Sequence, residues 1–237
     1  MFENGILAGR GGGHSSVSDN SGKETLMRLP ALIFDFGNVV AFFDYLKVCN
    51  RLGARVGLPE EEVRRRVLEL GFTRWLARFE AGEMTSSDFA ERITAPFELS
   101  LSHQEFVRDW EDIFWLNEPV SRLIVSLKAA GYTLILGSNT NPLHAAFFRR
   151  KFAETLDLFD AFVFSFEVGH LKPDARFYEA CARAAGVPAG SCLFIDDLEE
   201  NVAGARKAGL QGLQYVETTG LIAALSELGV EVAALQS

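Results

Sequence analysis

The sequence predicts an α/β fold with a doubly wound parallel sheet and an all-helical insertion after the first strand. Segments of helical length separate the last four of five short apolar runs, and buried strands joined by helices form parallel sheets covered on both faces. The stretch 45–119 instead shows helical periodicity without a strand-like run. The apolar runs span residues 31–36, 132–136, 161–164, 192–195 and 213–216.

The helices that connect these strands have well-marked ends. Asn141-Pro142 combines a good N-cap residue with proline at the first helical position. Lys172-Pro173-Asp174 opens a second helix, which we expect to stop at Gly186. Glu199-Glu200 lies in the first turn of a third helix, where carboxylates favour the helix dipole, and Gly209 closes it.

The inserted segment 45–119 has its own helix signals. Thr85-x-x-Asp88 and Ser102-x-x-Glu105 have the pattern of capping boxes. Apolar residues recur at helical spacing through the segment: Val63, Val67, Leu70, Phe72, Trp75, Leu76 and Phe79. We therefore expect a core formed by residues 29–44 and 120–237, with 45–119 as a separate helical unit.

The first 28 residues differ from the rest in composition. The stretch 11–21 is rich in Gly and Ser, and it contains no apolar core of signal-peptide length. We expect residues 1–28 to form a disordered leader. Cys49, Cys181 and Cys192 have no zinc-site spacing, so free thiols in a reducing cytoplasm are expected.

The overall charge narrows the classes of partner. A formal net charge of −9 argues against a nucleic-acid partner, because phosphate backbones are held mainly by Lys and Arg. No apolar run approaches the ~20 residues that a membrane helix needs. A small phosphorylated metabolite remains compatible, because a bound metal can reverse the local field. Whether the chain forms a homo-oligomer is left open.

Polar residues follow the ends of the predicted strands. Because ligands of open α/β sheets bind beyond the carboxyl ends of the strands, we expect these side chains to meet at one edge. They deliver three carboxylates, a hydroxyl, an amide and an amine: Asp35, Ser138, Asn139, Lys172, Asp196 and Asp197.

Such a site has a charge problem that a cation solves. Three carboxylates close together repel and raise one another's pKa. A divalent cation removes this repulsion, and Mg²⁺ suits a few carboxylates plus a substrate phosphate. Lys172 and the Ser138 hydroxyl can hold the remaining phosphate oxygens, near the N-terminus of the helix at Pro142. These are the parts that phosphoryl transfer through a carboxylate nucleophile requires.

Four segments then resemble the motifs of the haloacid dehalogenase (HAD) superfamily. They are Phe34-Asp35-Phe36-Gly37-Asn38-Val39, Gly137-Ser138-Asn139-Thr140-Asn141, Leu171-Lys172-Pro173, and Phe194-Ile195-Asp196-Asp197 with Asn201. Their order and spacing agree over roughly residues 29–217. The resemblance implies a HAD-like Rossmannoid core with a helical C1 cap over 45–119, and it is nearest to the group of α-D-glucose-1-phosphate phosphatases.

The resemblance also implies a role for each matched residue. Asp35 would be the nucleophile, with Mg²⁺ as the cofactor. The implied metal ligands all offer oxygen: Asp35, the Gly37 carbonyl, Asp196 and Asp197. The implied phosphate-binding residues are Ser138, Asn139 and Lys172, of which Ser138 and Lys172 would also act in catalysis.

One position departs from the common pattern of this superfamily. Most of its phosphatases have a second Asp two residues after the nucleophile, as general acid and base, where this chain has Gly37. A turn that requires a positive φ would also explain a glycine there. Asp44, His170 or Glu83 could supply the missing acid.

Two other functions compete with the predicted phosphatase. A 2-haloacid dehalogenase also uses an Asp nucleophile, but such enzymes need no metal and usually lack the acidic pair Asp196-Asp197. A catalytically weak HAD module that binds a phosphorylated ligand would explain Gly37. The acidic pair favours a Mg²⁺-dependent phosphatase acting on a small phosphomonoester, such as a sugar phosphate.

Overall fold

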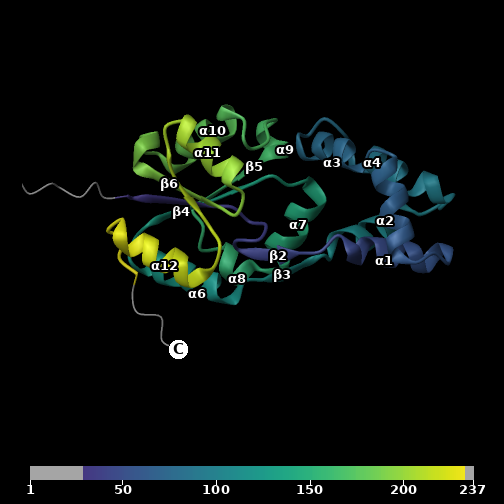
Figure 1. The fold of residues 1–237 in the computed structure, drawn as a ribbon, viewed down its shortest axis with the longest axis horizontal. Helices are drawn as coiled ribbons and strands as arrows, with labels where there is room; N and C mark the ends of the chain where they lie inside the picture. The colour runs from purple at the N-terminus through teal and green to yellow at the C-terminus, as the bar shows by residue number, and fades with distance from the viewer. Residues whose placement is uncertain (1–28, 233–237) are drawn as a thin grey trace, which may run out of the picture.

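A computed structural model describes residues 29–232 and shows a five-stranded parallel sheet with helices on both faces (Figure 1). The strand order is β5-β4-β1-β6-β7, so the chain completes one half of the sheet before it crosses to the other. The predicted doubly wound fold is confirmed, whereas the predicted leader lies outside the described residues. The strands are β1 (Ala31–Phe34), β4 (Thr133–Ser138), β5 (Ala161–Phe164), β6 (Cys192–Asp196) and β7 (Gln211–Gln214).

Alternate side chains of β1 belong to two separate hydrophobic clusters, one on each face of the sheet. Ala31 and Ile33 pack with buried residues of α10 and α11, and Leu32 and Phe34 pack with those of α6, α7 and α12. All four side chains are fully buried, as expected for the central strand of a covered parallel sheet. The helices are α6 (Glu118–Ala129), α7 (Pro142–Lys151), α8 (Ala153–Leu156), α10 (Ala175–Ala185), α11 (Glu199–Lys207) and α12 (Thr218–Glu227).

A second, helical unit is inserted between β1 and β4 and lies at one end of the molecule (Figure 1). It is connected to the core by an antiparallel pair, β2 (Ala41–Phe43) and β3 (Phe114–Leu116). We call α1–α5 the helical insertion. Its helices are α1 (Leu46–Val56), α2 (Glu60–Glu69), α3 (Phe72–Glu80), α4 (Ser86–Thr94) and α5 (His103–Glu111), with a 3₁₀ turn at Ala95–Phe97.

The expectation that 45–119 contains no strand is wrong at β3. This strand has three residues, all apolar, which is too short to show a period of two. Its only strand partner among the described residues is β2, with Phe114 opposite Phe43 across the whole insertion. A pairing between residues so distant in sequence leaves no local signal.

The predicted element ends are largely confirmed. Asn141 caps α7 by accepting a hydrogen bond from the His144 N–H at 3.1 Å, and Ser102 forms a reciprocal capping box with Glu105. Gly186 ends α10 with a φ of 68°. The last strand starts at Gln211 rather than Leu213, and Val216 lies beyond it, 81% exposed. No helix of the described residues is long and apolar enough to span a membrane.

Close packing between α10 and α11 predicts one sensitive position. A Cβ atom at Gly204 would lie 2.7 Å from Pro173 Cβ and 2.8 Å from Tyr178 Oη, so Gly204→Ala should destabilise the protein by about 1–3 kcal/mol. Gly220→Ala is the matched control, since Glu217 Cγ, the nearest atom outside the helix backbone, lies 3.8 Å from the Cβ position, and alanine favours the helix by about 0.5–1 kcal/mol. Urea unfolding of both variants measures the difference, and equal stabilities would contradict the packing account.

Candidate active site

The candidate site lies where the chain order of the sheet reverses. β1 and β6 are neighbours in the sheet, and the Asp35 N–H continues their pairing by donating to the Ile195 carbonyl at 2.8 Å. Asp35 follows the end of β1, and Asp196 is the last residue of β6. Ligands of doubly wound sheets bind at this switch point.

The ammonium group of Lys172 lies between these two carboxylates. Lys172 Nζ is 2.7 Å from Asp35 Oδ1 and 2.7 Å from Asp196 Oδ2, and its side chain is only 2% exposed. Burial alone would lower the pKa of Lys172, but the charges of Asp35 and Asp196 outweigh it and raise the pKa. Lys172 is therefore a fixed positive charge in the site.

Asp196 is held firmly by the surrounding chain. Its Oδ1 accepts hydrogen bonds from the Leu198 N–H at 2.9 Å and from Asn201 Nδ2 at 3.0 Å, while Oδ2 binds Lys172. The Tyr178 hydroxyl donates to the Asn201 carbonyl at 2.7 Å. Asp196 therefore has one fixed orientation.

Asp197 is more open and has a partner that the sequence did not reveal. Asn38 Nδ2 donates to Asp197 Oδ2 at 3.0 Å. Asn38 adopts a φ of 57°, the left-handed region that asparagine tolerates better than most residues. Burial raises the pKa of Asp197, and the Asn38 hydrogen bond opposes that shift.

The carboxylates of Asp35, Asp196 and Asp197 could hold a cation together. Each offers an oxygen atom, and these atoms lie within 4.8 Å of one another. Three carboxylates and the one ammonium leave two uncompensated negative charges. Burial, together with Asp196 and Asp197, raises the pKa of Asp35 against the opposing charge of Lys172. A divalent cation would supply the missing charge.

The backbone of Gly37 also fits such a cation site. Its carbonyl accepts no hydrogen bond from any residue between 29 and 232, so it is free to act as a ligand. A positive φ does not explain the glycine, because Gly37 is absent from the residues with that geometry, and this interpretation is wrong. A Cβ atom at Gly37 would instead lie 2.9 Å from Cε1 of the Phe43 ring.

The two predicted phosphate-binding residues of the second motif differ in their surroundings. Ser138, 3% exposed, ends β4 beside the start of α7. Asn139 is engaged with the backbone of Lys172: its Oδ1 accepts from the Lys172 N–H at 2.8 Å, and its Nδ2 donates to the Lys172 carbonyl at 3.2 Å. These bonds give Asn139 a positioning role, and its direct contact with phosphate stays a prediction.

Of the three proposed substitutes for a second Asp, Asp44 and Glu83 have other partners. Asp44 Oδ1 accepts from the Leu46 N–H at 2.8 Å at the start of α1. Glu83 is exposed and lies 3.4 Å from Arg78, and His170 lies on the partly exposed loop before Lys172.

One carboxylate of the helical insertion is coupled electrostatically to the core site: Glu80, at the end of α3, which the sequence did not single out. Burial raises its pKa to about 7, with Lys172 opposing that shift and Asp35 adding to it. In the sequence, Glu80 is only one more acidic residue near the end of a helix, because no local pattern indicates which way such a carboxylate faces.

His144 connects the second motif to the helical insertion. Its ring stacks on Trp110 of α5 with centroids 4.9 Å apart, and its Nε2 lies 3.2 Å from the Trp110 carbonyl. Its Nδ1 lies 3.0 Å from Asn141 Nδ2. Burial lowers the pKa of His144 to about 3, so the neutral ring is the folded form.

Comparisons with known proteins identify the family to which this parallel sheet and its strand-end site belong. Residues 29–209 match the model of the haloacid dehalogenase-like hydrolase family. The chain belongs to this family and is a hydrolase.

Its relatives include curated phosphatases. Phosphatase MT3486 of Mycobacterium tuberculosis is 31% identical over 86% of this chain and 96% of its own length. D-ribitol-5-phosphate phosphatase of Bacteroides thetaiotaomicron is 24% identical over 77% of this chain and 90% of its own length.

The fold is shared with solved members of the family. A HAD family enzyme from Bacteroides thetaiotaomicron superposes with a TM-score of 0.71 at 20% identity, covering 80% of this chain and 94% of that one. Its wild-type complex with magnesium and inorganic phosphate gives a TM-score of 0.67 at 20% identity, with coverages of 79% and 94%. The parallel core is therefore that of the family.

The depressed pKa of His144 predicts a pH-dependent stability. The folded state disfavours the imidazolium form of His144. Its contribution to the free energy of unfolding is therefore fully present above the unfolded-state pKa of 6.5 and is lost as the pH falls toward 3. Between pH 7 and 5 the loss should be about 2 kcal/mol. His144→Gln should remove this part of the slope in urea unfolding, whereas His103→Gln, at an exposed position, should retain it. Parallel slopes for all three proteins would contradict the assignment.

Proposed function

We propose that the chain is a magnesium-dependent phosphatase that hydrolyses a small phosphomonoester through an aspartyl-phosphate on Asp35. The observation that carries this proposal is the placement of Lys172 Nζ, 2.7 Å from both Asp35 and Asp196, beside a carboxylate cluster that keeps two uncompensated negative charges. The uncompensated negative charge favours a cation and the Lys172 ammonium favours a phosphate, so the site suits the binding of both together. The curated relatives named as phosphatases support the activity.

Magnesium is the cation that the donor set favours. Asp35, Asp196, Asp197 and the Gly37 carbonyl supply oxygen atoms only, the ligands that Mg²⁺ prefers. Bound there, Mg²⁺ would neutralise charge on the phosphate. The complex of the Bacteroides enzyme with magnesium and phosphate supports the choice.

The chain's own residues account for the chemical steps. Asp35 Oδ1 is fixed by the Phe36 N–H at 2.7 Å and by Lys172, which orients the carboxylate. A carboxylate oxygen of Asp35 forms a bond to phosphorus as the bond to the alcohol oxygen breaks. Water then attacks phosphorus, which releases inorganic phosphate and restores the carboxylate.

Lys172 and the second motif hold the transferring group. Lys172 supplies the positive charge, and Asn139 fixes the backbone of Lys172. The Ser138 hydroxyl, at the end of β4, offers a hydrogen-bond donor to the phosphate oxygens. In this account Asn139 acts through Lys172.

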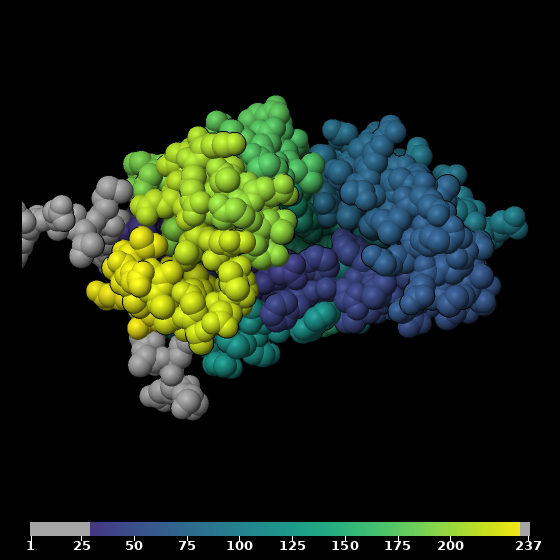
Figure 2. All heavy atoms as spheres, in the orientation of Figure 1, coloured from purple at the N-terminus to yellow at the C-terminus, as the bar shows by residue number. Residues whose placement is uncertain are grey.

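We also propose that the helical insertion is a cap that selects the substrate. Figure 2 shows the surface hollowed between the core and the insertion. The relative that acts on D-ribitol-5-phosphate, and the resemblance to glucose-1-phosphate phosphatases, make sugar phosphates the first class to test. The free thiols Cys49, Cys181 and Cys192 support a cytoplasmic location.

Phosphate release from a panel of phosphorylated metabolites tests the function. We expect turnover with Mg²⁺, none with a chelator, and none for Asp35→Asn at an unchanged melting temperature. The variant keeps the shape of the side chain but loses the nucleophile and one of the repelling charges.

A 2-haloacid dehalogenase would give the opposite pattern. Halide release that survives the chelator, without phosphate release from any ester, would overturn the proposal. Mg²⁺-dependent binding of phosphorylated ligands without turnover would favour a binding module instead.

A further inference from the structure

The first motif offers no second acid beside the nucleophile, because position 37 is a glycine. The ring of Phe43 on β2 lies where a side chain at position 37 would begin, with 2.9 Å between Cε1 and the position of a Cβ atom. Phe43 is itself held by edge contacts with Tyr45 at a centroid distance of 5.6 Å. A proton donor for the leaving oxygen is therefore to be sought on another element.

The end of α3 is fixed above the strand-end edge of the core. The turn after Glu80 packs so closely on α9 (Ser165–Val168) that a Cβ atom at Gly82 would lie 2.5 Å from the Phe166 carbonyl oxygen. Figure 1 shows α3 beside α9. Because α9 leads directly into the loop that carries Lys172, this contact brings the end of α3, where Glu80 lies, next to the segment that bears Lys172.

The Glu80 carboxyl is available to a ligand. It is partly buried, follows the fully buried Phe79, and has no hydrogen-bond or ion-pair partner within residues 29–232. The charged groups that act on it belong to the core and are Lys172 and Asp35. Glu80 in turn raises the pKa of Tyr45, which is already raised by burial.

The direction of attack assigns a role to this carboxyl. In phosphoryl transfer the attacking and leaving oxygens lie roughly in line on opposite sides of phosphorus. Asp35 attacks from the core, so the leaving oxygen faces the helical insertion. We propose that Glu80 is the general acid that protonates the leaving alcohol, and then the general base that takes a proton from the attacking water. This inference rests on the proposed phosphatase function.

The protonation behaviour of Glu80 agrees with this role. Its pKa, raised to about 7 chiefly by burial, keeps a substantial fraction of the acid form near neutral pH. Three elements pack against α3, which are α2, α4 and α9, and their charged residues are not among the groups that shift it; these residues include Arg66, Glu69, Asp88, Arg92 and Glu167. Asp35 and Lys172 therefore set its charge environment.

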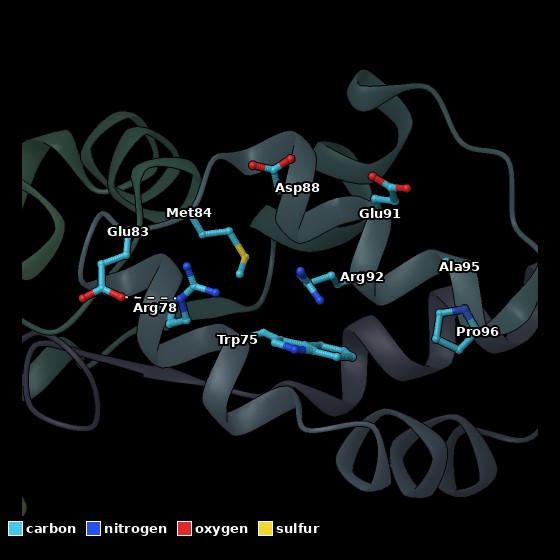
Figure 3. Close-up of a pocket in the computed structure, with 9 residues that line it drawn as sticks. All are labelled: Trp75, Arg78, Glu83, Met84, Asp88, Glu91, Arg92, Ala95 and Pro96. Carbon is cyan, nitrogen blue, oxygen red and sulfur yellow. Dashed lines mark hydrogen bonds and ion pairs between the residues drawn. The ribbon is translucent and has the colours of Figure 1, made fainter.

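Glu83, three residues later, provides a matched control. Figure 3 shows it beside Arg78 at the edge of a pocket between α3 and α4, which Trp75, Met84 and Arg92 also line. Its carboxyl is paired with Arg78 at 3.4 Å. Glu83→Gln therefore removes a carboxylate from the same turn without changing the proposed acid.

Single-turnover phosphorylation of Glu80→Gln and Glu83→Gln, over a series of aryl and alkyl phosphates, tests the proposal. The phosphorylation rate of Glu80→Gln should fall by ~10²- to 10⁴-fold on alkyl phosphates. It should fall little on aryl phosphates, which have acidic leaving groups. Its rates should therefore depend steeply on leaving-group pKa, whereas those of the wild type and Glu83→Gln should not. The retained aryl rate shows that the variant is folded.

The pH profile gives a second readout, with Glu80→Asp as the conservative variant. The wild-type kcat/KM on an alkyl phosphate should fall as the pH rises through about 7, because the acid form is lost. Glu80→Gln should lack this limb, and Glu80→Asp should restore part of it. If the wild type turns over but Glu80→Gln matches Glu83→Gln in both readouts, the inference is wrong. If the wild type releases no phosphate from any ester, the proposed function itself fails.

Discussion

The site depends on the buried ammonium of Lys172 between Asp35 and Asp196. Burying an unpaired charge is costly, so the Lys172 ammonium offsets much of the cost of holding two carboxylates at the buried sheet edge. Three chain segments must meet to form this contact: the end of β1, the end of β6 and the loop before α10. The ion pairs therefore explain why Asn139 and Asn201 are committed to holding Lys172 and Asp196.

The remaining negative charge and the helical insertion are the other two features on which the site depends. Lys172 compensates one of the three carboxylates, and the deficit is what makes the edge of the sheet a site for a cation and a phosphate. The insertion is joined to the core by the β2–β3 pair and by the stack of Trp110 on His144. It therefore lies on the side of the site that is opposite the core. In the proposed mechanism the core holds the phosphate, and the insertion meets the leaving group.

The sequence predicted what is encoded locally. Apolar runs, caps and the polar residues at strand ends located β1, β4, β5 and β6, and placed Asp35 and Asp196 at one edge. Long-range geometry was not predictable: among the described residues β3 pairs only across the insertion, Asn38 reaches Asp197 through an uncommon φ, and the position of the end of α3 depends on how it packs on α9. Gly37 was noticed from the sequence, but the closeness of the Phe43 ring to it emerged only from the fold.

In the proposed mechanism Asp35, fixed by Lys172, becomes covalently phosphorylated. Rapid acid quenching after mixing with a phosphomonoester and Mg²⁺, followed by mass spectrometry of the peptides, tests it most directly. We expect one phosphoryl group on the peptide that contains Asp35, and we expect it to form and disappear within a turnover. The same peptide of Asp35→Asn should carry no phosphoryl group. Phosphate release at the normal rate, with no modified peptide at any quench time and with activity retained in Asp35→Asn, would contradict it.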